Sequence, residues 1–121
     1  MIVAYWIVAG LLAAFYVYSG GMKLLQPQEK LRPMMGWVDA VPMTAVRVIG
    51  ALEILGALGL ILPPLTGILS GIAFAAAIGL VLLQVGGISL HLSRGEARLI
   101  GLNIGALVAA GVTAWLATIW L

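Results

Sequence analysis

The sequence contains no cysteine, which excludes disulfides, thiolate chemistry and cysteine-ligated metal sites. It is also poor in charge, since Asp, Glu, Lys and Arg make up only 8% of its 121 residues, against about 25% in soluble domains. No basic run accompanies the net charge of +2, so nothing points to a nucleic-acid partner. Hydrophobic residues make up 64% of the chain. A soluble domain of this size has too little interior to bury them, so we expect a lipid bilayer to surround the protein.

Long apolar segments account for most of the chain. They lie at about residues 2–22, 44–62, 65–91 and 99–121. Each is long enough to cross a bilayer as an α-helix. No charge precedes the first segment, so we expect a retained span rather than a cleaved signal peptide. We expect Pro63-Pro64 to end the second span. The predicted fold is therefore all-α: one transmembrane domain over residues 1–121, an integral membrane bundle of four transmembrane helices.

The polar segment between the first two spans, residues 23–43, holds charges and prolines together with apolar side chains. Because Met34, Met35, Trp37 and Val38 belong to it, we expect this loop to lie in the membrane interface rather than in bulk water. The third span is longer than a bilayer needs, so we expect it to tilt, to kink near its glycine pair or to extend beyond the hydrocarbon core.

Lys and Arg outside the spans occur only in the first and third loops. Because cytoplasmic loops carry an excess of these residues, we expect both loops in the cytoplasm and both termini outside it. Trp6, Trp115 and Trp120 would then mark the outer interface.

Small residues recur at four-residue spacing in the spans, a pattern that lets helices approach closely in lipid. The stripes are Gly10 and Ala14; Gly50, Gly56 and Gly59; Gly67, Gly71, Ala75 and Gly79; and Gly101, Gly105, Ala109 and Thr113. They suit an intramolecular bundle, and one of them could also form a homo-oligomer.

Glu53 is the most informative residue, because a carboxylate at bilayer depth costs several kcal/mol unless it is paired, protonated or hydrated. We therefore expect it to face the bundle interior. Arg47, on the same span, and Lys23, at the end of the first span, are its candidate partners. The cluster serves either as an ion pair that fixes helix register or as a site for a polar ligand or a proton.

Other polar side chains lie within or beside the spans. His91, the single histidine, either caps a helix end at the interface or titrates near neutral pH. Gln84 and Asn103 are expected to hydrogen-bond between helices. Tyr16 and Tyr18 are expected either to anchor the interface or to line a pocket for an aromatic or quinone-like ring. We expect no metal site, because one His and one Glu are too few ligands.

Two motifs resemble those of the DoxX-like family. SGGMKL at residues 19–24, followed by Pro27, resembles the end of that family's first span, and RVIGALEILG at residues 47–56 resembles its second-span signature. The resemblance covers essentially the whole chain. It implies a small protein of the cell inner (cytoplasmic) membrane of bacteria or archaea, with a polar cluster of Lys23, Arg47, Glu53 and His91.

Some members of that family are membrane subunits of quinone-linked oxidation, and others associate with redox or oxidative-stress proteins. The first hypothesis is accordingly a membrane subunit that binds a quinone or another lipophilic ligand and works with a redox partner protein. The second is a non-enzymatic scaffold or assembly factor, and the third is a small transporter component. No self-contained catalytic motif is present.

Overall fold

The computed structural model describes residues 1–33, 35–39 and 41–121, and over these residues the protein is all-α, without a strand. Within them, four helices are long and apolar enough to cross a membrane, as predicted. They are α1 (Ile2–Leu25), α3 (Met43–Thr66), α4 (Ile72–Ser93) and α5 (Gly101–Leu116), the last continued by the turn η3 (Ala117–Trp120). The protein is thus an integral membrane helix bundle.

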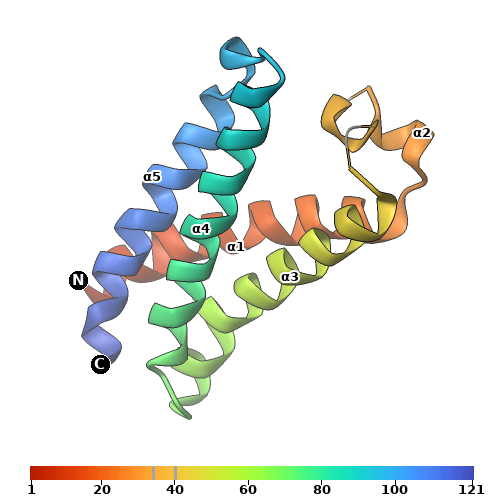
Figure 1. Ribbon diagram of the computed structural model, residues 1–121. Helices are drawn as coiled ribbons and strands as arrows, with labels where there is room; N and C mark the ends of the chain where they lie inside the picture. Colours follow the sequence, from red (N-terminus) through yellow and green to blue (C-terminus); the bar gives the residue numbers. More distant parts are fainter. Residues whose placement is uncertain (34, 40) are drawn as a thin grey trace.

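The bundle consists of two helix pairs that cross obliquely (Figure 1). One pair is α1 with α3, and the other is α4 with α5; α3 also contacts α4, and α1 contacts α5. Both chain termini lie at one end of the bundle, and the loops that follow α1 and α4 lie away from it (Figure 1). Toward these loops the two pairs diverge, so the space between them widens.

The expected end of the second span at Pro63-Pro64 is wrong. Helix α3 continues through both prolines to Thr66, and Gly67 ends it with a left-handed φ of 73°. The next helix therefore begins at Ile72 rather than at residue 65. With its 22 residues it reaches about 33 Å, so it has no excess length to accommodate.

A hydroxyl from α1 explains why α3 tolerates a proline near its end. Pro64 has no N–H, so the carbonyl of Leu60, four residues earlier, loses its helical donor. The Tyr5 hydroxyl donates to this carbonyl oxygen at 2.6 Å. Neighbouring helices commonly satisfy the backbone groups that proline frees in a membrane.

The apolar core lies between the four long helices, and its buried residues are mostly alanine. On α4 and α5 the buried small residues are Ala73 and Ala77, and Ala106 and Ala110. Of the small-residue stripes predicted for these two spans, Ala75, Gly79, Gly101 and Gly105 are exposed, whereas Thr113 is buried. A Cβ built on Gly79, Gly101 or Gly105 would meet no atom within 4 Å, so these glycines make no close helix contact within the described chain.

The loop between α1 and α3 folds into the short helix α2 (Gln28–Leu31) and the turn η1 (Gly36–Asp39). A small apolar cluster holds it against α3: Leu31, Val38 and Val46 are buried, with Met35 and Trp37 packed against them. Met34, which contributed to the prediction of an interfacial loop, lies outside the described residues.

Candidate functional site

The site begins where α1 and α3 touch backbone to backbone. A Cβ built on Gly20 would lie 2.6 Å from the carbonyl oxygen of Gly50, and one built on Gly50 would lie 2.8 Å from that of Gly20. Residues three positions along a helix share a face. Lys23 and Glu53 each follow one of these glycines by three residues, so the glycine contact brings the two side chains together.

Lys23 and Glu53 form a buried ion pair. The Lys23 ammonium donates to Glu53 Oε1 at 2.5 Å and to the hydroxyl of Ser19 at 2.7 Å. The two side chains are only 9% and 4% exposed. Since an unpaired charge at this depth is costly, each group requires the other.

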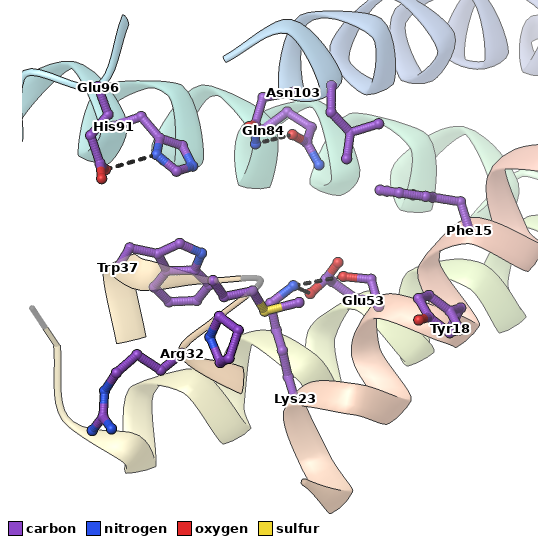
Figure 2. Close-up of a pocket in the computed structure, with 14 residues that line it drawn as sticks. Phe15, Tyr18, Lys23, Arg32, Trp37, Glu53, Gln84, His91, Glu96 and Asn103 are labelled. Atoms are coloured by element: carbon purple, nitrogen blue, oxygen red, sulfur yellow. Dashed lines mark hydrogen bonds and ion pairs between the residues drawn. The ribbon is translucent and has the colours of Figure 1, made fainter. Parts of the chain in front are cut away.

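The ion pair lies on the wall of a cavity of about 530 Å³ between the two helix pairs. This volume is within the usual range for ligand pockets, about 300–1,000 Å³. Figure 2 shows the polar side chains of α4 and α5 facing Lys23 and Glu53 across this space. The lining residues are Phe15, Tyr18, Ser19, Lys23, Arg32, Pro33, Met35, Trp37, Glu53, Gln84, His91, Glu96, Leu102 and Asn103.

Two hydrogen-bonded amides, those of Gln84 and Asn103, lie on the opposite wall. Asn103 Nδ2 on α5 donates to Gln84 Oε1 at 3.0 Å, and Gln84 Nε2 on α4 donates to the hydroxyl oxygen of Tyr16 at 2.6 Å. These bonds join α5, α4 and α1, as expected for interhelical hydrogen bonds. They also place amides on the wall of the cavity, so the groups that hold the helices together also line it.

His91 lines the same cavity near the end of α4. Its Nδ1 lies 3.1 Å from Oε1 of Glu96 (Figure 2). The same oxygen forms an ion pair with Arg94 Nε at 3.3 Å. The single histidine therefore faces the polar space and has a carboxylate partner from the following turn.

The interfacial loop covers one side of the cavity. Trp37 lines it, with the Lys23 ammonium 5.8 Å from the ring centroid. Arg32 Nε donates to both carboxylate oxygens of Asp39, at 3.1 and 2.8 Å, which ties α2 to η1. This hydrogen bonding lowers the pKa of the exposed Asp39 carboxyl from its usual value.

Arg47 is not among the residues that line this cavity. Its guanidinium donates to the backbone carbonyls of Lys23 and Gln26, both at 2.6 Å. These carbonyls belong to the C-terminal end of α1, where helical partners are missing. The structure thus brings together Lys23, Glu53 and His91 of the predicted cluster, whereas Arg47 holds the backbone behind them.

A second cavity, of about 330 Å³, adjoins the first at the ion pair. Lys23, Trp37, Glu53, Gln84, His91 and Asn103 line both cavities. The larger cavity also touches Phe15 and Tyr18 of α1 and Leu102 of α5, whereas the smaller one touches Ile49 of α3 and Leu82 of α4. The polar space therefore has one side between α1 and α5 and another between α3 and α4.

Sequence reasoning did not assign Trp37 to the site, nor did it assign Gln84 or Asn103 to a ligand cavity. Trp37 was expected only to lie at the membrane interface, and the amides only to join helices. Their polar or aromatic character in an apolar chain was the available signal. Within the described residues, no group of three or more His, Cys, Asp or Glu side chains could hold a metal ion.

Residues 7–115 match the sequence model of the DoxX-like family. No curated protein and no solved structure matches the chain.

Proposed function

Since this chain belongs to the DoxX-like family, we propose that it is a membrane subunit that binds a quinone or a similar lipophilic ring compound in the cavity beside Lys23 and Glu53. The observation that carries this proposal is the buried ion pair on the wall of a 530 Å³ space with aromatic side chains around it. Purely structural ion pairs need no such space.

The wall of the cavity offers both kinds of hydrogen-bonding group that a quinone and its reduced form require. Lys23 has three N–H donors, and its hydrogen bonds within the described residues account for two of them. Among the residues that the structure describes, neither Glu53 Oε2 nor Asn103 Oδ1 accepts a hydrogen bond. A carbonyl on the ligand would accept from Lys23, and a ligand hydroxyl would donate to Glu53 or Asn103.

The aromatic residues fit a flat ring. Phe15 and Tyr18 come from α1 and Trp37 comes from the loop, so aromatic groups lie on different sides of the polar space (Figure 2). Offset or edge-to-face contacts between such rings and a ligand ring stabilise binding.

We assign this chain the binding of the ligand and assign electron transfer to a redox partner protein. The loops rich in Lys and Arg would face the cytoplasm, with both termini on the other side of the cell inner membrane. The site would then lie toward the cytoplasmic side, where a soluble partner can reach it.

Binding of a water-soluble dimethoxy-methyl-benzoquinone to the purified protein in lipid nanodiscs tests the proposal. Saturable quenching of tryptophan fluorescence is the readout, since Trp37 lines the cavity. We expect Glu53→Gln and Asn103→Leu each to weaken binding by about tenfold or more, because one hydrogen bond to a buried group is lost. Ser89→Ala is the control, because the Ser89 hydroxyl donates to the carbonyl of Val85 in its own helix and Ser89 does not line the cavity.

The absence of saturable quenching in the unaltered protein contradicts the proposal, and so does equal binding by all three variants. Melting followed by circular dichroism checks that each variant is folded. Asn103→Leu keeps the test valid if Glu53→Gln fails to fold, because it leaves the ion pair intact.

A non-enzymatic scaffold is the second candidate, and one observation favours it. Gly79 on α4 and Gly101 and Gly105 on α5 leave open space where another helix could approach. Under this function the quinone would not bind, and Glu53→Gln would change folding or oligomeric state alone.

A further inference from the structure

An apolar groove of about 380 Å³ runs along the outside of α1 and α5, directly beside the larger polar cavity. The two spaces share Phe15 and Leu102 in their walls, so they lie next to each other. From Phe15 the groove follows α1 back to Val8, which is about 10 Å at the helical rise. It therefore leads from the polar site along the bilayer-spanning surface.

The groove exists because α5 presents its smallest residues there. Gly105 and Ala109 lie in its wall, and a Cβ on Gly105 would meet no atom within 4 Å. The face of α5 that packs in the core is instead formed by Ala110 and Ala114. The exposed Gly105 and the half-buried Ala109 thus leave room beside the core.

The charges around the polar cavity pair with one another. Lys23 pairs with Glu53, Arg32 with Asp39, and Glu96 with His91 and Arg94. No cation of the wall is left over within the described residues to balance an anionic group, so a phosphate headgroup would bring an uncompensated charge. The cavity favours an uncharged headgroup.

A hydrocarbon chain gains little hydrophobic free energy by leaving lipid for a groove that is itself apolar. The groove contributes by providing room for the chain. A headgroup can remain in the cavity only if its chain has a way out. Because the two spaces adjoin at Phe15 and Leu102, we infer that the ligand is a two-part lipid, with an uncharged ring headgroup beside Lys23 and Glu53 and a long chain that lies in the groove between α1 and α5. Such a ligand enters sideways from the bilayer. This inference rests on the proposed function, which it deepens by assigning the ligand class and its route.

A matched groove between α3 and α4 provides the control. It has about 550 Å³, and Gly79 lines it, again with open space around a built Cβ. This groove shares Leu82 and Leu83 with the smaller of the two polar cavities. We assign the chain to the α1/α5 side because the larger cavity, with Phe15 and Tyr18, opens there.

The test compares two benzoquinones with the same ring, one without a chain and one with a decyl chain, in nanodiscs at a fixed lipid ratio. Gly105→Leu fills the groove between α1 and α5, and Gly79→Leu fills the one between α3 and α4. We expect Gly105→Leu to weaken binding of the decyl compound by about tenfold through steric exclusion and to leave the chainless compound unchanged. Gly79→Leu should change neither.

Each other outcome has a definite meaning. If decyl binding is insensitive to Gly105→Leu, or falls in Gly79→Leu instead, the inferred route is wrong while the proposed function stands. If the chainless compound fails to bind the unaltered protein, the proposed function itself fails. Binding of the chainless compound also reports that each variant is folded; should Gly105→Leu lose it, Val8→Phe narrows the same groove from α1 and replaces that variant.

Discussion

At the scale of single residues, the two cations near Glu53 have different roles. Lys23 donates to the carboxylate, whereas Arg47 donates to two carbonyls at the end of α1. Arg47 precedes Glu53 by six residues, which places it on another side of the same helix. Lys23 comes from α1, whose backbone touches that of α3, so its side chain needs to span only a short distance to the Glu53 carboxylate.

Tyr5 provides a residue-scale prediction. We expect Tyr5→Phe to lower the free energy of unfolding by about 1–3 kcal/mol, because the carbonyl of Leu60 then has no donor in place of the N–H that Pro64 lacks. Denaturant titration in detergent, followed by circular dichroism, measures the change.

The matched control is Tyr18→Phe, since the Tyr18 side chain is exposed, and its effect should be within about 0.5 kcal/mol. In addition, Pro64→Ala should reduce the cost of Tyr5→Phe, because an alanine N–H can donate to Leu60. An equal cost of Tyr5→Phe in both backgrounds would show that this hydrogen bond is not the cause.

At the scale of helices, the close contact between α1 and α3 depends on two glycines, Gly20 and Gly50. Their carbonyl oxygens lie so near the opposite backbone that a methyl group has no room. In lipid, such close packing replaces the water expulsion that holds soluble helices together. The same contact sets the Lys23–Glu53 distance, so packing and site geometry are linked.

Gly20→Ala is therefore expected to destabilise the protein by about 1–3 kcal/mol, because its Cβ would lie 2.6 Å from a backbone oxygen that cannot turn away. The neighbouring Gly21→Ala is the matched control. Its Cβ meets nothing within 4 Å, so the substitution should be neutral or stabilise the helix by about 0.5–1 kcal/mol. Thermal melts of the two variants, measured side by side, test this prediction. Equal stabilities of the two variants would refute the close backbone contact between α1 and α3.

At the scale of the whole molecule, oblique crossing of the two helix pairs produces a polar space in an otherwise apolar bundle. The pairs meet near the chain termini, where Tyr5, Trp6 and Trp120 make edge-to-face contacts with ring centroids 5.4–6.2 Å apart. They diverge toward the other end (Figure 1). The cavity lies in that opening, close to the end where the Lys- and Arg-bearing loops emerge.

The proposed orientation is testable because the chain has no cysteine of its own. A single Ala97→Cys, in the exposed turn after α4, should react with a membrane-impermeant maleimide only when the cytoplasmic face is accessible. Ser70→Cys, in the turn between α3 and α4, should react from the opposite face. The reverse labelling pattern in intact cells and inverted vesicles would mean that the protein is inserted the other way round.

The sequence alone determined the all-α membrane fold and the DoxX-like family, because long apolar segments and the motifs around Lys23 and Glu53 are local properties of the chain. It also indicated that Glu53 requires a partner, since that requirement follows from the solvent. The tertiary structure alone decided which cation pairs with it, why Pro64 remains in a helix, and which glycines make close contacts. It also decided that Trp37, Gln84 and Asn103 share a cavity. These facts depend on how helices distant in sequence cross, and a helix's own periodicity does not specify its neighbour or the angle at which they meet.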